Sequence, residues 1–199
     1  IRALQRSQDR QVPILRDTPG TVVHARTFSS DNPRRLGWDM LRQRMSEDGR
    51  VTLRGVTEAD VDEAMKELKG FNPIQHRWDF FMADADTIRA ACRPLVETPL
   101  PDGLYQVESQ AMDHSLIHQV QVFLDEQGIS PFSKDALAGR LFPAQLVAFC
   151  DRDSSIVAAG FAAMTHNRFS PFEGAAWVGL IAVAPKWRGH ALGTRIDAI

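Results

Sequence analysis

The sequence predicts an α/β fold with a mixed sheet, preceded by a small α/β region at the N-terminus, and three observations predict it. Apolar, strand-like runs at 144–150, 156–164 and 175–184 follow one another closely. Segments with helical spacing of apolar residues precede these runs in both halves of the chain. The stretch "RPLVETPLPDG" holds three prolines and a glycine, and we expect it to separate an N-terminal region, 1–98, from a second domain, 104–199, with the boundary at 99–103.

In the N-terminal region, whose role the sequence does not indicate, the pattern alternates between short strands and helices. Trp38, Leu41 and Met45 are spaced by three and four residues, as on one face of a helix. Thr57 followed by Asp60 is typical of a helix N-cap. The expected elements are a strand at 21–28, a helix at 34–45, a strand at 50–56, a helix from Thr57 to a stop at Gly70, and a helix at 76–92.

The second region is expected to begin with a strand, continue with two helices and end with three strands and a further helix. Asp113 can cap the first of these helices and Gly128 can close it. "DRDSS" is a polar turn between two strands, which predicts a hairpin. The expected elements are a strand at 104–109, helices at 113–128 and 133–141, strands at 144–150, 156–164 and 175–184, and a helix after Pro185.

Composition excludes several classes of protein. With 24% charged residues, 44% hydrophobic residues and a net charge of -2, the chain has no general attraction to nucleic acid or to acidic membranes. Cys92 and Cys150 are too few for a disulfide framework or a Cys-rich zinc site, which favours a reducing, cytoplasmic setting. His114 and His118 are one helical turn apart, but no third ligand is apparent, so a polar helix face is favoured and no metal is expected.

The segment "VAPKWRGHALGTRI" carries the strongest functional signal. A strand-like run ends at Pro185, small and basic residues follow, and a helical pattern begins. A helix N-terminus presents unpaired N–H groups and a partial positive charge, and small residues let a ligand approach the main chain. Lys186 and Arg188 could add charge-assisted contacts to phosphate. The alternative is an ordinary strand–turn–helix connection with solvated basic residues.

The same residues resemble motif A of the GCN5-related N-acetyltransferases, the GNAT superfamily, in which a Val-x-Pro step precedes Arg/Gln-x-x-Gly-x-Gly/Ala. The resemblance covers about residues 104–199 and implies a mostly antiparallel central sheet flanked by helices. It implies that acetyl-CoA lies along the last strand, with its pyrophosphate on the amides that follow. The residues that it assigns to coenzyme binding are Ile181, Ala182, Val183, Arg188, Gly189, His190, Ala191, Leu192, Gly193 and Thr194.

The sequence departs from the family pattern at one position, since Ala191 stands where the first glycine is usual. Its methyl group narrows the approach to the backbone, which is compatible with weaker coenzyme binding or with a degenerate site. By the resemblance, Glu173 is the expected catalytic base, with a solvated loop carboxylate as the alternative. Tyr105 is the sole tyrosine and lies on the first strand, so it does not match the family's tyrosine acid, which is expected beyond Ile199.

The resemblance thus implies an acetyl-CoA-dependent N-acetyltransferase that acts on an amine of a small molecule or of a protein. Two alternatives remain open: a non-catalytic acyl-CoA-binding or regulatory module, and an interaction protein in which the motif is accidental. The family also places a parallel strand after the last helix, so we expect the natural chain to continue past Ile199 and, since Ile1 is not Met, to be incomplete at its front. If it ends at Ile199, we expect the missing strand to come from a second copy, as in a homodimer.

Overall fold

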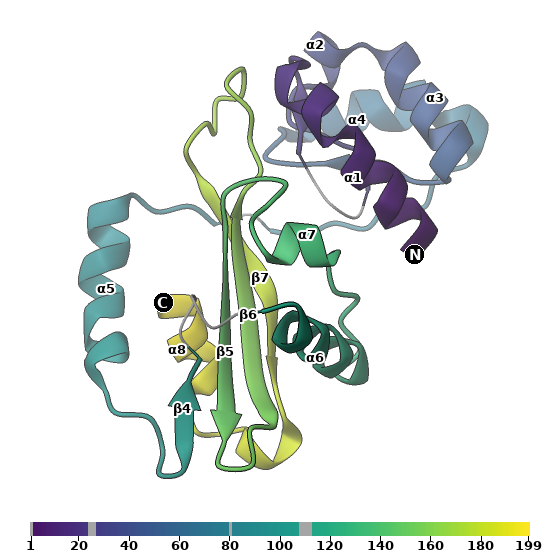
Figure 1. The fold of residues 1–199 in the computed structure, drawn as a ribbon. Helices are drawn as coiled ribbons and strands as arrows, with labels where there is room; N and C mark the ends of the chain where they lie inside the picture. Colours follow the sequence, from purple (N-terminus) through teal and green to yellow (C-terminus); the bar gives the residue numbers. More distant parts are fainter. Residues whose placement is uncertain (1, 24–26, 80, 108–112) are drawn as a thin grey trace. The chain divides into compact units, whose positions relative to one another are not determined.

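The computed structural model describes residues 2–23, 27–79, 81–107 and 113–199 and divides the chain into two compact units (Figure 1). The first unit comprises Ile1–Phe81 together with Met164–Ala175, and the second comprises Met82–Ala163 and Ala176–Ile199. This division differs from the predicted boundary at 99–103. It also shows that the segment between two strands of the second unit is part of the first.

The first unit is built from short strands and helices. Its elements are α1 (Arg2–Asp17), β1 (Thr21–Val22), β2 (Ser29–Ser30), α2 (Pro33–Leu36), α3 (Trp38–Asp48), β3 (Thr52–Leu53), α4 (Glu58–Glu67) and the 3₁₀ turn η1 (Lys69–Phe71). The strands form a sheet in the order β1-β2-β3, in which β1 and β2 are antiparallel and β2 and β3 are parallel. The capping box predicted at Thr57 and Asp60 is present at the start of α4.

The second unit is a four-stranded sheet covered by helices. Its elements are α5 (Ala85–Glu97), β4 (Leu104–Gln106), α6 (His114–Glu126), α7 (Lys134–Leu137), β5 (Ala144–Asp151), β6 (Ile156–Met164), β7 (Ala176–Val183), the 3₁₀ turn η3 (Pro185–Trp187) and α8 (Leu192–Ala198). The strand order is β4-β5-β6-β7, and β4–β5 and β5–β6 pair antiparallel. The predicted fold class, a mixed α/β protein with a mostly antiparallel sheet, is confirmed.

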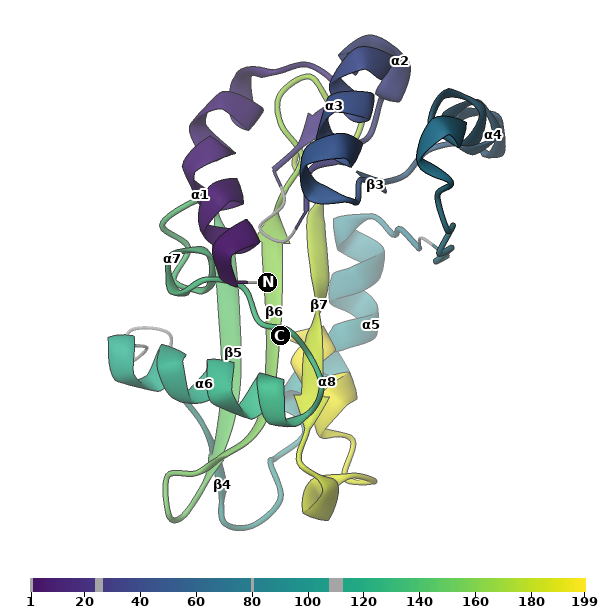
Figure 2. The ribbon, with the colours of Figure 1, turned by 90° about the vertical axis from the view of Figure 1, so that its right-hand side faces the viewer.

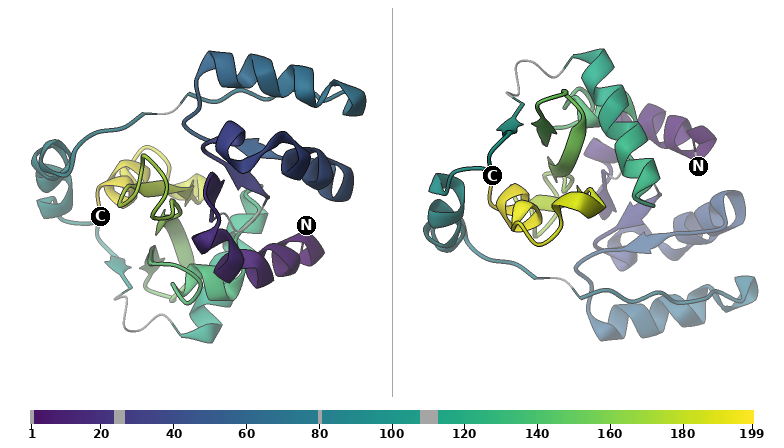
Figure 3. Two further views of the ribbon diagram at one scale, coloured as in Figure 1. Left: turned by 90° about the horizontal axis from the view of Figure 1, so that it is seen from above. Right: turned by 90° about the horizontal axis from the view of Figure 1, so that it is seen from below.

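Helices cover both faces of this sheet. Figures 1 and 2 show α6 across one face of β5–β7 and α8 on the other, and the view from below in Figure 3 shows the strands between them. The hairpin predicted at "DRDSS" is confirmed, with Asp151 accepting hydrogen bonds from the amides of Asp153 and Ser155 at 3.2 and 3.0 Å. The core of the second unit thus lies between the sheet and the helices that cover its two faces.

Several predicted elements were wrong in extent, and each has a local reason. The helix expected at 34–45 is divided by Gly37, whose φ of 96° is incompatible with helix. The helix expected at 76–92 instead begins after Asp84, whose carboxylate accepts from the amides of Asp86 and Thr87, and it continues through Pro94. The strands expected at 50–56 and 104–109 are confined to β3 and β4, and 108–109 lie outside the described residues.

The N-terminal segment also differs from expectation. The helix α1 was not predicted, and Pro13 lies inside it. The strand expected at 21–28 is two residues long, and residues 24–26 lie outside the described part of the chain. The helix expected at 133–141 is the short α7. Strand and helix lengths were therefore overestimated where turns interrupt the pattern.

Candidate functional site

The motif forms the strand–turn–helix connection that the sequence predicted. β7 ends at Val183, Pro185 opens the turn η3, and α8 begins at Leu192. The ten predicted coenzyme-binding residues all lie in the second unit on these consecutive elements. Ile181, Ala182 and Val183 end β7; Arg188, Gly189, His190 and Ala191 form the turn; Leu192, Gly193 and Thr194 form the first turn of α8.

The helix α8 folds back onto the sheet because its apolar residues are buried there. Leu192 and Ile196 belong to a core cluster with residues of β5 and β6. A Cβ atom added to Gly160 of β6 would lie 2.0 Å from Cγ2 of Ile196, so the glycine permits the close approach of helix and strand. Gly193 is less restricted, because its added Cβ would lie 3.7 Å from the side chains of Ile181 and Val183.

Two consecutive residues of β6 identify the two faces of the sheet. Gly160 and Phe161 are neighbours in a strand and therefore point to opposite faces. The Gly160 side contacts α8 through Ile196, and we call it the α8 face. The Phe161 ring packs edge-on against Phe132 at 5.2 Å between centroids, and we call this side the Phe132 face.

The side chains of β7 do not keep the regular alternation between the two faces along the whole strand. Trp177 contacts Phe132 at 5.8 Å and thus lies on the Phe132 face, whereas Ile181 lies 3.4 Å from the added Cβ of Gly160 on the α8 face. Residues four apart in a regular strand share a face. Between them, Leu180 has a φ of 55°, an uncommon conformation for a bulky residue. We infer a β-bulge at Leu180, which is the type of irregularity that re-aims side chains near active sites.

The turn after β7 contains two further left-handed residues. Gly189 has a φ of 83° and Ala191, the N-cap of α8, has a φ of 57°. No side chain of the described residues caps this helix end, so its first amides keep their hydrogen-bonding capacity. Successive backbone N–H groups in a turn can form a concave site that attracts an anion. Ala191 therefore adopts a conformation that glycine prefers.

Arg188 is the cation at this turn. Its Nε donates to the carbonyl of Val183 at 3.2 Å, and its Nη2 donates to Oε1 of Gln127 at 3.4 Å. Both partners are neutral, and the residue is exposed, so its positive charge remains uncompensated by these contacts. Gln127 is the C-cap of α6, so Arg188 connects the end of that helix with the end of β7.

Lys186, by contrast, is paired. Its ammonium group lies 3.2 Å from Oδ2 of Asp151 at the end of β5. Hydrogen bonds from the backbone N–H of Ser155 and from Lys186 lower the pKa of Asp151 below its usual value. Lys186 thus connects the turn η3 to the β5–β6 hairpin, and its charge is less available to a ligand than that of Arg188.

Arg195 lies farther along α8, and its Nη2 donates to the carbonyl of Val96 in α5 at 3.0 Å. Its Nε and Nη1 are buried and have no hydrogen-bond partner among the described residues. His190 is exposed, and its ring packs against Trp187 at 5.7 Å between centroids. The basic character of the turn is therefore carried by Arg188, with Arg195 behind it in the helix.

Glu173 is not grouped with the other predicted site residues. It belongs to the first unit, in the segment that precedes β7, and it is exposed. Its backbone N–H donates to the carbonyl of Ser170 at 3.3 Å. Tyr105 lies on β4, and its hydroxyl donates to the hydroxyl of Ser154 at 3.1 Å.

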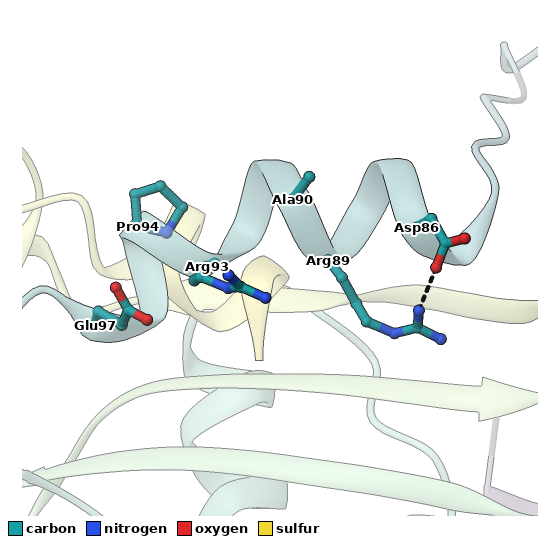
Figure 4. A pocket seen from close by; sticks show the side chains of 6 residues that line it. All are labelled: Asp86, Arg89, Ala90, Arg93, Pro94 and Glu97. Atoms are coloured by element: carbon teal, nitrogen blue, oxygen red, sulfur yellow. Dashed lines mark hydrogen bonds and ion pairs between the residues drawn. The ribbon is translucent and has the colours of Figure 1, made fainter.

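A shallow pocket of about 380 Å³ lies elsewhere, along the helix α5 (Figure 4). All the residues that line it are exposed and come from this one helix: Asp86, Arg89, Ala90, Arg93, Pro94 and Glu97. Arg89 pairs with Asp86. No residue of the motif takes part in this pocket, so we do not assign it to the site.

Two residues of the site were missed by sequence reasoning. The bulge at Leu180 had a signal, because an isolated glycine in a strand pattern, Gly179, marks such irregularities. A Cβ at Gly179 would lie 2.4 Å from the Trp177 ring, so the glycine makes room for that side chain. Gln127 gave no comparable signal, since its contact with Arg188 depends on the fold.

Comparisons with known proteins do not assign the chain to a family. No protein-family model matches it, and no curated protein matches it. It is similar to an X-ray structure of a Drosophila protein of unstated activity, with 14% sequence identity and a TM-score of 0.44, over 98% of this chain and 72% of that one. Within the described residues, no group of three or more His, Cys, Asp or Glu side chains could hold a metal ion. In the same residues, no helix combines the length and the apolar character needed to cross a membrane.

Proposed function

We propose that the chain is an acetyl-CoA-dependent N-acetyltransferase of cytoplasmic setting that acetylates an amine of a small molecule or a protein. One observation carries the proposal: after the left-handed Leu180, β7 leads into a turn with two more left-handed residues, Gly189 and Ala191. The helix that follows has no side-chain cap among the described residues and begins beside the cation of Arg188. This arrangement has the donors and the charge that a pyrophosphate requires.

In the proposed complex, the amides of residues 188–194 would bind the pyrophosphate, and Arg188 would add a charge-assisted hydrogen bond. Gly189 is exposed and an added Cβ there would meet no atom within 4 Å, so the backbone is open to a ligand at this point. The main chain at the end of β7 would pair with the extended pantetheine arm as an added strand does. Ile181, Ala182 and Val183 would supply those main-chain groups.

Acetyl-CoA supplies a thioester whose carbonyl carbon a neutral amine can attack, with release of the thiol. Glu173 would take the proton of the ammonium form of the acceptor, as a general base. Main-chain N–H groups near the bulge at Leu180 would donate to the developing oxyanion, because a bulge leaves part of the ladder unpaired. The support for Glu173 is its position in the sequence just before β7, together with its exposure.

A specific observation favours a second candidate function, a non-catalytic acyl-CoA-binding module. The methyl group of Ala191 lies at the N-cap of α8, and the residue is exposed where the pyrophosphate would approach. The two candidates differ in turnover. An N-acetyltransferase releases free thiol from acetyl-CoA in the presence of its amine, and Glu173→Gln would reduce this rate, whereas a binding module releases no thiol with any amine.

Calorimetric titration of the intact protein with coenzyme A tests the coenzyme site that both functions share. We expect binding by the wild type and at least about tenfold weaker binding by Arg188→Glu, because a phosphate-facing charge is reversed. Arg93→Glu is the matched control, since Arg93 is an exposed arginine of the same unit outside the motif. Absence of binding to the wild type, or equal losses in both variants, would refute the proposal.

A further inference from the structure

The segment Met164–Ala175, which we call the β6–β7 loop, belongs to the first unit, although β6 up to Ala163 and all of β7 belong to the second. It is joined to the first unit by backbone pairing. His166 forms an isolated antiparallel bridge with Val22, and the N–H of Val23 donates to the carbonyl of Thr165 at 2.7 Å. The loop that carries Glu173 is therefore held by residues from the N-terminal region of the chain.

The strongest attachment is the buried side chain of Asn167, which is 6% exposed. Its Nδ2 lies 3.0, 2.9 and 2.9 Å from the carbonyl oxygens of Leu15, Thr18 and Thr21. Its Oδ1 accepts from the N–H of Phe169 at 3.0 Å, within the loop. One side chain thus connects the loop with the end of α1 and the start of β1.

This attachment follows from the needs of a buried helix end. The last carbonyls of an α-helix have no partner within the helix, and an unpaired buried carbonyl is costly. Leu15 is buried near the C-terminus of α1, and its carbonyl also accepts from the hydroxyl of Thr21 at 2.6 Å. Asn167 supplies further donors from a distant part of the sequence, so removing its amide affects α1 and the loop together.

A second attachment leads directly to Glu173. The Nδ1 of His166 lies 3.1 Å from Oδ2 of Asp31, and the two side chains are 3% and 1% exposed. The same nitrogen lies 3.1 Å from Oγ of Ser170. Ser170 in turn accepts from the N–H of Phe172 through Oγ and from the N–H of Glu173 through its carbonyl. A continuous set of contacts therefore extends from Asp31 to the backbone of Glu173.

Side-chain packing also attaches the β6–β7 loop to the first unit. The ring of Phe172 lies so near Gly55 that a Cβ atom there would be 2.4 Å from the ring. The ring also packs against His166, with centroids 5.2 Å apart. Charged groups around the loop come from the first unit as well: Arg54 donates to the hydroxyl of Thr165, and Arg168 pairs with Asp17.

We propose that Asn167 and the Asp31–His166 pair are positioning residues that hold the backbone of the β6–β7 loop, and with it the carboxylate of Glu173, in the conformation needed for proton transfer. The N-terminal region, for which the sequence indicated no role, is then a working part of the transferase. The kinetic part of this inference rests on the proposed function, whereas its structural part does not.

The test compares Asn167→Ala and Asp31→Asn with the wild type in the full chain. Hydrogen exchange of the amides in 164–175 should become about tenfold faster in Asn167→Ala, because local opening costs less. The Asp31→Asn variant keeps an acceptor oxygen and should show a smaller change in the same direction. Arg168→Ala is the control in the same loop. Its ion pair with Asp17 is largely exposed and should contribute little to the stability of the loop.

The second measurement is the steady-state rate at which the protein releases free thiol from acetyl-CoA in the presence of an amine acceptor. We expect kcat to fall by about tenfold in Asn167→Ala with the KM for acetyl-CoA within about twofold of wild type, because the chemical step and not coenzyme binding is affected. A merely structural role would raise the KM for acetyl-CoA as well, or would change neither parameter once the rate is divided by the folded fraction of the protein. Asp31→Asn provides the same comparison if Asn167→Ala fails to fold.

The outcomes separate this inference from the proposed function. Unchanged loop exchange in both variants, or faster exchange with unchanged kcat, would overturn the positioning role. If the wild type binds no acetyl-CoA in calorimetry, the proposed function is wrong, and loop exchange alone then decides whether the N-terminal region holds this loop. Faster exchange in Arg168→Ala equal to that of Asn167→Ala would also overturn the inference.

Discussion

At the scale of single residues, Ala191 and Gly189 show how backbone conformation limits the motif. Both have positive φ values, 57° and 83°, but only one is glycine. A left-handed residue with a Cβ atom costs about 1–2 kcal/mol relative to the right-handed region. The turn therefore holds a strained residue at the position where the proposed site faces its ligand, a common place for such strain.

Opposite substitutions at these two positions make the first prediction. We expect Gly189→Ala to reduce the free energy of unfolding by about 1 kcal/mol, because the space is open and only the conformation is unfavourable. We expect Ala191→Gly to leave stability equal or raise it by up to about 1 kcal/mol, with coenzyme binding equal or tighter. Urea unfolding measures both, and a loss of stability in both variants would contradict the assigned conformations.

At the scale of elements, the close contact between α8 and β6 is tested by a second matched pair of variants, both changes of glycine to alanine. Gly160→Ala should lower the free energy of unfolding by about 1–3 kcal/mol, because its Cβ would overlap the Ile196 side chain. Gly193→Ala should be neutral or stabilising by up to about 1 kcal/mol, since its Cβ would meet atoms at 3.7 Å and glycine is unfavourable in helices. Thermal unfolding of both variants checks this order, and the reverse order would show that α8 packs differently.

The β5–β6 hairpin makes a prediction about pH. Hydrogen bonds lower the pKa of Asp151 in the folded state, so its ionised form contributes stability above the ordinary aspartate pKa of about 3.9. This contribution is lost as the pH falls through the lowered pKa. Asp151→Asn should therefore be less stable than wild type at pH 7, and the difference should shrink below about pH 4. Unfolding of Asp151→Asn and of the exposed control Asp153→Asn across this range tests it, and a constant difference would contradict the lowered pKa of Asp151.

Across the whole molecule, the sequence predicted some parts well for physical reasons. The strand at 156–164 has the predicted bounds, β5 is one residue longer than predicted at its end, and β7 is one residue shorter at each end. Long apolar runs indicate burial in a sheet directly, which is why these strands were predicted well. The strand–turn–helix motif was also placed correctly, since Pro185 and Gly189 specify a turn locally. Short strands such as β3 were overestimated because their pairing, and not their own composition, sets their length.

The division into two units could not be predicted from local patterns. It depends on contacts between residues far apart in the sequence, such as Asn167 with Leu15 and Thr18. An asparagine in a polar loop has no feature that distinguishes a buried cap from a solvated side chain. The prolines at 94, 99 and 101 indicated a boundary, but Pro94 is inside α5 and the units separate elsewhere. For the same reason, the sequence pattern predicted that Glu173 shares a site with residues that belong to the other unit.

The crystal structure of this protein grown with acetyl-CoA tests the central claim most directly. We predict difference density along β7 for the pantetheine arm, with the pyrophosphate within hydrogen-bonding distance of the amides of residues 188–194 and of Arg188. Ligand density at a different place, such as the pocket along α5, would contradict the account. So would crystals grown at a saturating concentration of acetyl-CoA that show no ligand density at this turn.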